Sequence, residues 1–143
     1  MIHLNLITLS GRHLDQEIYE LMVPTTAGTI AINQGHAPLL GAVAPGILSI
    51  RHKQSDSDAS REQVGVYNGT VEVLNNTISL LVDEIDTPDN VVEHDAQAAL
   101  KRAQELKAKA GDAVSLADAQ TMMDRQAVRL QLAGLKKSSK KRY

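Results

Sequence analysis

The 143-residue chain contains no cysteine, no phenylalanine and no tryptophan, and only three tyrosines. The missing cysteine excludes disulfides, thiolate metal sites and cysteine nucleophiles. Because 43% of the residues are hydrophobic but almost none is aromatic, a core has to be built from Leu, Ile, Val and Ala. A chain of this length usually forms one domain, or one domain with an appendage.

Long hydrophobic runs are also missing. No apolar run approaches the ~20 residues that a helix needs to span a bilayer. The N-terminus has no basic region followed by an apolar stretch and a cleavage site, so it does not resemble a signal peptide. We therefore expect a soluble protein that stays in the compartment where it is made.

The net charge of −2 conceals an uneven distribution of charge along the chain. Residues 1–90 hold 4 Lys/Arg and 11 Asp/Glu, whereas residues 91–143 hold 11 Lys/Arg and 6 Asp/Glu. The sign of the charge changes where the hydrophobic pattern changes too. This coincidence predicts two modules, residues 1–90 and 91–143.

The first module shows short alternating apolar runs separated by Gly, Pro and Asn, which indicates strands and turns. Polar residues 53–60 predict a solvated hairpin loop. Asn68-Gly69 predicts a two-residue hairpin, since both central residues of such a turn need φ > 0, and Asn75-Asn76 predicts the next reversal. The expected strands are residues 2–9, 17–23 (ended by Pro24), 29–32, 40–43, 47–52, 63–67, 70–74 and 77–82. Nine or ten such strands predict a β-sandwich or barrel.

In the second module the apolar period becomes helical, after residues 91–93 that could complete the sheet. The first helix is expected to begin with Asp95 as its N-cap and to end near Gly111, and the second to begin with Ser115 as its cap and Asp118 three residues on. The short connection makes the two helices antiparallel neighbours. Each helix has an apolar stripe, the set of apolar residues expected on one of its faces. The stripe of the first helix is Ala96, Ala99, Leu100, Ala103, Leu106 and Ala110. The stripe of the second helix is Leu116, Ala119, Met123, Ala127, Leu130 and Ala133 or Gly134.

The two Ala-rich stripes bury little area, so the hairpin is expected to be weakly held and able to open. The tail from Lys136 to Tyr143 is expected to fray.

Few residues of the chain suggest a catalytic or metal-binding site. The five histidines lack metal-ligand spacing, and Asp83, Glu84 and Asp86 are interpreted as an acidic strand end. There is no Gly-rich phosphate loop and no nucleophile elbow around a serine. We therefore expect no catalytic residue, no metal and no cofactor.

The basic C-terminal region has several possible partners. Five Lys/Arg in the last eight residues could bind nucleic acid or an anionic membrane. No aromatic residues are interleaved for base stacking, and the helical face lacks bulky anchors for a membrane surface. An acidic protein surface fits better, while residues 138–143 are best interpreted as a solubilising tail.

Gly35-His36-Ala37-Pro38-Leu39-Leu40, followed by Pro45-Gly46, resembles the signature of the epsilon subunit family of the F-type ATP synthase (delta in mitochondria). The order of the other parts is similar too: an opening strand, an Asn-Gly hairpin in place of the family's Gly-Gly, a last strand near Val91 and an Ala-rich helical hairpin. The resemblance covers almost the whole chain.

The resemblance implies a ten-stranded N-terminal β-sandwich in the rotor's central stalk, followed by an antiparallel two-helix hairpin. The sandwich would bind the gamma subunit and stand on the membrane c-ring, with Thr8, Thr29 and His36 in loops near that foot and Pro38 beside them. The hairpin would fold against the sandwich or extend toward the alpha/beta catalytic head and inhibit ATP hydrolysis. Its candidates for contacting the head are Arg125, Arg129, Lys136 and Lys137.

The chain departs from the family pattern at three places. Gln34 stands where the family often has Pro, and Thr29 where it often has an acidic residue, so the ring contact is expected to be less electrostatic. Some members bind ATP through Ile/Leu-Asp-x-x-Arg-Ala at the start of the hairpin. Here Asp95 is present but Ala98 replaces the Arg, so ATP binding is not expected.

Two functions from different classes therefore compete. The first is a non-catalytic rotor subunit, peripheral to the cytoplasmic face of a bacterial energy-transducing membrane or, as the second choice, to the stromal side of a thylakoid. The second is a free-standing β-sandwich adaptor whose basic helical tail binds acidic proteins or RNA.

Overall fold

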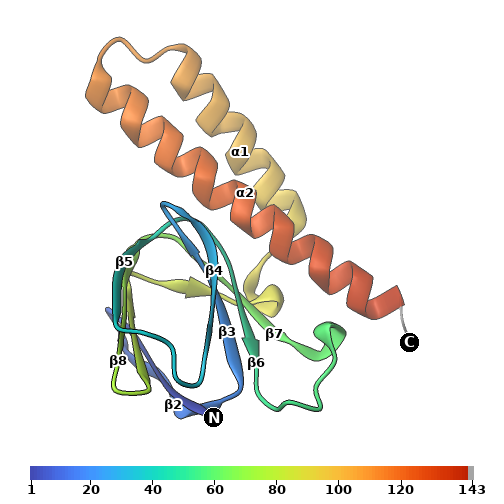
Figure 1. Ribbon diagram of the computed structural model, residues 1–143. Helices are drawn as coiled ribbons and strands as arrows, with labels where there is room; N and C mark the ends of the chain where they lie inside the picture. The colour runs from blue at the N-terminus through green and yellow to red at the C-terminus, as the bar shows by residue number, and fades with distance from the viewer. Residues whose placement is uncertain (142–143) are drawn as a thin grey trace. The chain divides into compact units, whose positions relative to one another are not determined.

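The computed structural model describes the backbone of residues 1–141 and the side chains of residues 1–135. It has two compact units, the first from Met1 to Ile85 and the second from Asp86 onward. A ten-stranded β-sandwich is followed by an antiparallel pair of helices, as predicted (Figure 1). The strands are β1 (Ile2–Thr8), β2 (Gly11–Ile18), β3 (Glu20–Thr25), β4 (Gly28–Asn33), β5 (Leu39–Val43), β6 (Gly46–Arg51), β7 (Glu62–Val66), β8 (Gly69–Leu74), β9 (Thr77–Val82) and β10 (Ile85–Asp86).

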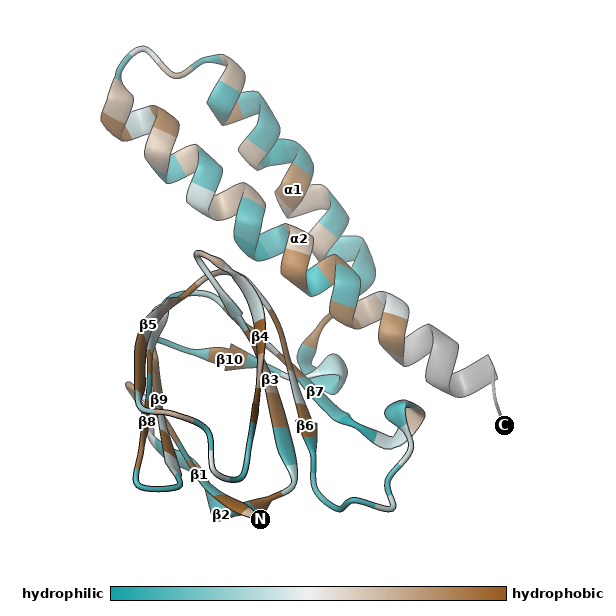
Figure 2. Cartoon of the chain, in the orientation of Figure 1, coloured by the Kyte–Doolittle hydropathy of each residue, from teal (hydrophilic) through white to brown (hydrophobic). Residues whose placement is uncertain are grey.

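The sheet follows the order β10-β7-β6-β3-β5-β8-β9-β1-β2, and β4 pairs with β3 outside this path. The ladder between β1 and β9 is parallel, whereas the ladders β1–β2, β3–β4, β3–β5, β3–β6, β5–β8, β6–β7 and β8–β9 are antiparallel. The sheet folds over so that its inner faces enclose one hydrophobic core, which Figure 2 shows as brown segments along the strands. The buried cluster consists only of Ile, Leu and Val: Ile2, Leu4, Leu6, Ile18, Leu21, Val23, Ile32, Val43, Leu48, Ile50, Val64, Val66, Val71, Val73, Ile78, Leu80 and Val82.

Two strands replace the single strand expected at residues 17–23. β2 and β3 meet at Tyr19, and β3 continues through Pro24, which pairs with Thr29 of β4. The expectation that Pro24 ends the strand is wrong because this proline needs only its carbonyl, which accepts a hydrogen bond from the Ala44 N–H at 3.0 Å. β2 shows no clear alternation in the sequence because it is an edge strand with mostly exposed, polar residues.

The hairpin predicted at Asn68-Gly69 is not formed. β7 pairs with β6, whereas β8 pairs with β5 and β9, and neither Asn68 nor Gly69 has a positive φ. The two-residue reversal lies instead at Asn75 and Asn76, whose φ angles are 51° and 57°, between β8 and β9. Asn tolerates this left-handed region better than most residues.

Gly69 is needed for space and not for its φ angle. A Cβ atom on Gly69 would lie 2.0 Å from the carbonyl oxygen of Leu81, a backbone atom of the neighbouring strand β9. Gly41 is a contrasting glycine in the same sheet, because a Cβ there would meet only a Val71 methyl group at 3.5 Å. The close approach of β8 and β9 therefore depends on the missing side chain at residue 69.

The second unit begins with a 3₁₀ turn, η2 (Pro88–Asn90), followed by helix α1 (Glu93–Ala108) and helix α2 (Ala113–Lys141). The last strand is therefore β10 and not the predicted strand near Val91. The two helices lie along each other in opposite directions, which confirms the predicted hairpin (Figure 1).

The helix caps differ from those predicted. α1 begins at Glu93, which places Asp95 in its first turn, where a carboxylate favours the helix dipole. Asp112, and not Ser115, caps α2: Asp112 Oδ1 accepts the Ser115 N–H at 2.7 Å, and this hydrogen bond lowers the pKa of Asp112.

The buried face of the hairpin is small and partly different from the predicted stripe. In α1 the buried residues are Ala96 and Ala103. In α2 Ala127 is exposed, and the buried residues described there are Ala119, Val128, Leu132 and Ala133. The tail predicted to fray from Lys136 is helical as far as Lys141, and residues 142–143 lie outside the described residues.

We predict that Gly69→Ala lowers the stability of the sandwich by about 1–3 kcal/mol, because β9 has to move away from the new methyl group. Chemical denaturation followed by circular dichroism measures the loss. Gly41→Ala is the matched control and is expected to cost much less. Equal losses in the two variants would contradict the close-approach explanation.

Candidate functional site

The candidate residues of the sandwich lie in two groups. Thr8 ends β1, where its hydroxyl donates to the Gly11 carbonyl at 3.1 Å and lies 2.9 Å from the Ser10 hydroxyl. Thr29 is exposed near the tip of the β3–β4 hairpin, opposite Pro24. The β3–β5, β5–β8, β8–β9 and β1–β9 registers bring the start of β4 and the end of β1 to the same end of the sandwich.

His36 and Pro38 lie in the loop between β4 and β5, at the opposite end. The His36 N–H donates to the Asn33 carbonyl at 3.1 Å, and His36 Nδ1 lies 2.7 Å from the Ala37 carbonyl. Pro38 is exposed. Residues 30–33 of β4 separate this loop from Thr29, a span of about 15 Å. The structure thus corrects the expectation of one common foot: Thr8 and Thr29 share one end, and His36 shares the other end with Pro38.

Asn76 holds the signature loop in place. Gly35, with φ of 79°, directs its N–H to Asn76 Oδ1 at 3.1 Å, while Asn76 Nδ2 donates to the Met1 carbonyl at 2.9 Å. The Asn76 carbonyl accepts the His3 N–H at 3.2 Å. One asparagine therefore joins the signature loop, the β8–β9 turn and the chain start, and no local sequence pattern indicated this role.

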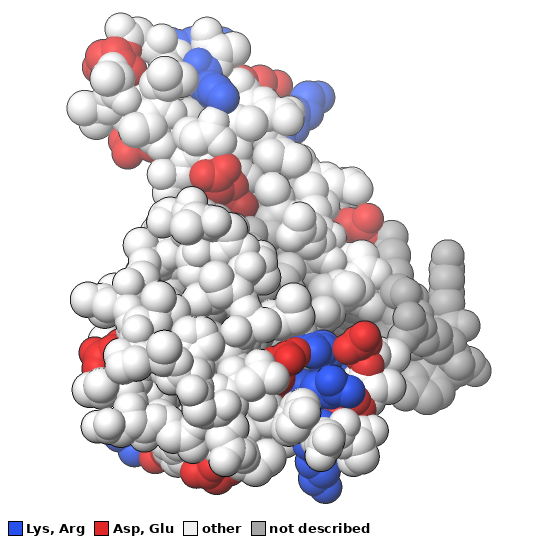
Figure 3. Space-filling model, in the orientation of Figure 1, with Lys and Arg blue, Asp and Glu red and all other residues white. Residues whose placement is uncertain are grey.

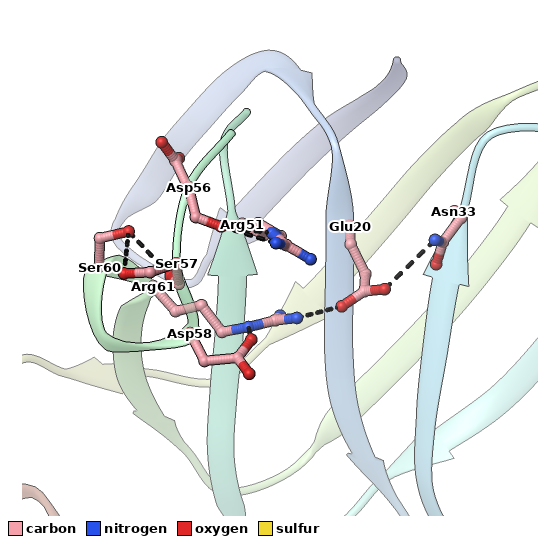
Figure 4. A network of polar contacts seen from close by, with 8 residues as sticks. All are labelled: Glu20, Asn33, Arg51, Asp56, Ser57, Asp58, Ser60 and Arg61. Carbon is pink, nitrogen blue, oxygen red and sulfur yellow. Dashed lines mark hydrogen bonds and ion pairs between the residues drawn. The ribbon is translucent and has the colours of Figure 1, made fainter. Parts of the chain in front are cut away.

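A network of charged side chains fixes the loop between β6 and β7 (Figure 4). Arg61 donates to Glu20 and, at 3.1 Å, to Asp58, while Asn33 donates to the other Glu20 oxygen at 3.2 Å. The hydrogen bond from Arg61 lowers the pKa of Glu20, so the carboxylate stays ionised. The sequence did not reveal this pair because its members are 41 residues apart.

Arg51 adds a second attachment for the same loop. It donates twice to the Asp56 carbonyl, at 2.9 and 2.6 Å, and its guanidinium lies 5.5 Å from the centre of the Tyr19 ring. In the space-filling view, charges of both signs gather near this loop, while most of the sandwich surface facing the viewer is uncharged (Figure 3). The paired charges give a rigid polar surface and hold no group poised for acid–base chemistry.

His3 lies between two carboxylates on the β1–β2 ladder. Its Nε2 contacts Asp15, its Nδ1 lies 3.1 Å from Glu17 Oε1, and Arg12 binds Asp15 at 2.7 Å. Both ring nitrogens donate only in the protonated imidazole. The hydrogen bonds with Asp15 and then Glu17 raise the pKa of His3 above its ordinary 6.5.

The basic candidates of the hairpin differ in their surroundings. Arg129 Nε donates to Asp86 Oδ2 at 3.0 Å, within the second unit. Arg125 is half-buried and also has interaction partners. Lys136 and Lys137 lie outside the residues whose side chains are described. Asp95, the remaining residue of the ATP-binding pattern, is exposed.

Among the residues that the structure describes, no three or more His, Asp and Glu side chains are grouped so that they could hold a metal ion. No helix in the described part of the chain is long and apolar enough to cross a membrane.

These features define the class: a ten-stranded β-sandwich joined to an antiparallel helical hairpin, with its candidate residues on surfaces and loops. Residues 1–88 match the family model described as ATP synthase, Delta/Epsilon chain, beta-sandwich domain. The chain belongs to the ATP synthase delta/epsilon chain family, which confirms the resemblance found in the sequence.

Curated relatives extend the likeness to both units. An ATP synthase epsilon chain of Synechococcus elongatus is 34% identical over 122 residues, covering 84% of this chain and 85% of the relative. The epsilon chain of Chloroflexus aggregans is 29% identical over 136 residues, covering 95% and 94%.

Solved structures share the fold at low sequence identity. A chain in the Euglena gracilis mitochondrial ATP synthase structure, which contains OSCP, F1 and c-ring, superimposes with a TM-score of 0.79 at 18% identity. This match covers 94% of the present chain and 81% of the other. A chain from the central stalk and c-ring of the Tetrahymena thermophila enzyme gives a TM-score of 0.56 at 19% identity, covering 96% and 95%.

We predict that Asn76→Gly destabilises the sandwich by about 1–2 kcal/mol relative to Asn75→Gly, because it leaves the Gly35 N–H and the Met1 carbonyl without their amide partner. Both substitutions keep the positive φ available, so their difference isolates the Asn76 side chain. Thermal unfolding of the two variants gives the comparison. A more stable Asn76→Gly than Asn75→Gly would contradict the assigned role.

We also predict a pH-dependent contribution of His3 to stability. Because its folded-state pKa is raised, the stabilisation is fully present below pH 6.5 and is lost as the pH rises through the folded-state pKa. His3→Gln should therefore be less stable than the parent at about pH 5 and closer to it at about pH 9. The exposed His13→Gln is the control, and a His3→Gln deficit that does not change with pH refutes the prediction.

Proposed function

We propose that the chain is a non-catalytic rotor subunit in the central stalk of an F-type ATP synthase, where it couples proton translocation through the c-ring to ATP synthesis. The observation that carries the proposal is the likeness to curated epsilon chains over both units and almost the full length of those relatives. The alternative, a free-standing adaptor, has no comparable support.

The sandwich, residues 1–90, is the part proposed to bind the gamma subunit and the c-ring. Its two polar ends, one with Thr8 and Thr29 and the other with His36 and Pro38, can serve different partners at once. The sheet ladders hold the strands that carry these loops, and the Arg61–Glu20 pair fastens the loop between β6 and β7, which gives the stiff body that transmission of torque requires. Since Thr29 and Gln34 are uncharged, contacts there rely on hydrogen bonds and shape.

The hairpin, residues 91–143, is proposed to inhibit ATP hydrolysis. Its basic residues Arg125, Arg129, Lys136 and Lys137 are the candidates for binding acidic segments of the alpha/beta head. Ala98 stands where an ATP-binding hairpin has Arg, so nucleotide control of this movement is not part of the proposal.

The proposed location of the subunit in the cell follows from its proposed place in the ATP synthase complex. The subunit would be attached to the cytoplasmic face of a bacterial energy-transducing membrane through gamma and the c-ring, with no active site of its own. It needs no cofactor and no nucleic-acid partner for this role.

The test compares two tagged forms in native membranes, the full chain and a chain ending at Asn90. Both are expected to co-purify with gamma, alpha and beta subunits, because the binding surfaces lie on the sandwich. Preparations with the shortened chain should hydrolyse ATP faster, because the inhibitory hairpin is missing. Hydrolysis is measured by phosphate release, with synthase lacking tagged protein as the reference.

The two readouts separate the two parts of the proposal. Unchanged hydrolysis after truncation would refute the inhibitory role but leave the stalk role standing. Recovery of no synthase subunit, from membranes that contain the enzyme, would favour the adaptor that binds acidic proteins or RNA.

A further inference from the structure

The pair Asn68-Gly69 forms no hairpin, and it is the only Asn-Gly sequence in the chain. An asparagine before glycine is unusually reactive, because the next main-chain nitrogen can reach the carbon of the side-chain amide. Glycine has no Cβ atom to obstruct this approach, and it adopts the required backbone angles at low cost. The other asparagines precede Leu, Gln, Asn, Thr or Val, whose side chains hinder the same approach.

Asn68 occupies the exposed bend that connects β7 to β8. Its carbonyl accepts the Asp83 N–H at 3.1 Å, whereas its side-chain amide makes no hydrogen bond with any of the described residues. The side-chain amide of Asn76, by contrast, donates to the Met1 carbonyl at 2.9 Å. The Asn68 amide is therefore able to turn toward the main-chain nitrogen of the next residue.

The nitrogen of Gly69 lies at the end of a ladder. Gly69 opposes Val82 of β9 and also Val43, the last residue of β5. The Asp83 N–H donates to the Asn68 carbonyl one residue beyond the Gly69–Val82 pair. That pair is thus a non-hydrogen-bonded one, and the Gly69 N–H points toward β5. Because the terminal pair of a ladder opens at a small cost in free energy, this nitrogen becomes available for reaction.

We propose that Asn68 is a site of spontaneous deamidation, at which the chain acquires an aspartate or an isoaspartate as it ages. The Gly69 nitrogen loses its proton to hydroxide and forms a bond to Asn68 Cγ. The bond from Cγ to the side-chain nitrogen breaks, and ammonia leaves with a proton taken from water. Water then opens the resulting succinimide ring at either of its carbonyl carbons. One opening gives aspartate, and the other gives isoaspartate, in which the main chain passes through the former side chain.

Isoaspartate is the damaging product, because it adds a carbon atom to the main chain directly before Gly69. A Cβ atom on Gly69 would lie 2.0 Å from the Leu81 carbonyl oxygen, so β8 has no room for a displaced backbone at this point. Aspartate keeps the normal backbone and only adds an exposed negative charge near Asp83. Isoaspartate is therefore expected to weaken the contact between β8 and β9, and aspartate to leave it intact.

The site is tested by ageing the isolated full-length chain in warm, mildly alkaline buffer and measuring the conversion of each asparagine by mass spectrometry. One tryptic peptide, residues 62–101, contains Asn68 together with Asn75, Asn76 and Asn90 as internal controls. Asn68 is expected to lose its amide at least about tenfold faster than Asn90, which is also exposed but precedes a valine. Conversion at Asn68 that is no faster than at Asn90 overturns the proposal.

The part played by the ladder is tested by ageing the same chain in guanidinium chloride, in which the sandwich is unfolded. Conversion of Asn68 should be about tenfold faster there than in the native chain, because the Gly69 nitrogen no longer faces β5. Equal rates in the native and the unfolded chain would overturn the conclusion that opening of the Val43–Gly69 pair limits the reaction.

The structural effect is tested on the separated products. Each product carries an additional negative charge, so anion exchange separates it from the parent, and methylation by an isoaspartyl methyltransferase identifies the isoaspartate form. That form should melt about 5 °C below the parent, whereas Asn68→Asp, with its normal backbone, should melt close to it. Asn68→Ser, aged in the same way, is the control for damage elsewhere. An equal loss in aged Asn68→Ser, or an isoaspartate form as stable as the parent, overturns the assigned effect.

Discussion

The parallel ladder between β1 and β9 is the constraint on which the sandwich depends. It joins residues 3–7 to residues 77–81 and so places the chain start beside the last long strand of the sheet. The turn at Asn75 and Asn76 delivers β9 in the correct register, and Gly69 lets β8 approach it closely. Through Asn76 the same region holds the signature loop, so the position of His36 depends on pairing far from it in the sequence.

The two units are stabilised by different means, and the difference bears on the proposed function. The sandwich has a continuous core of Ile, Leu and Val, and charged pairs such as Arg61–Glu20 fasten its loops. The hairpin buries mainly small side chains and has the partly exposed Arg129–Asp86 pair. A sandwich with a continuous core, joined in sequence to a hairpin that buries mainly small side chains, agrees with the proposed division into a binding part and a regulatory part.

Much of the fold could be predicted because its signals are local. Alternation of residues such as Ile2, Leu4 and Leu6 marks a strand with one buried face, and the change to a helical period marks the hairpin. The positions of the candidate residues were harder to predict. Nothing within a few positions of Thr29 or His36 shows at which end of a sheet each residue will lie. The Arg61–Glu20 and Arg129–Asp86 pairs join residues more than 40 positions apart and leave no periodic signal.

Strands followed by a helical hairpin, an aliphatic core and the family could thus all be predicted from the order of the residues alone. Only long-range contacts set which strands pair, place Pro24 inside a strand, leave Asn68-Gly69 without a hairpin and bring Arg129 to Asp86. The physical reason is that period and turn preference are properties of neighbouring residues. Pairing partners and buried charges depend on how the whole sheet and hairpin bury their apolar surface together.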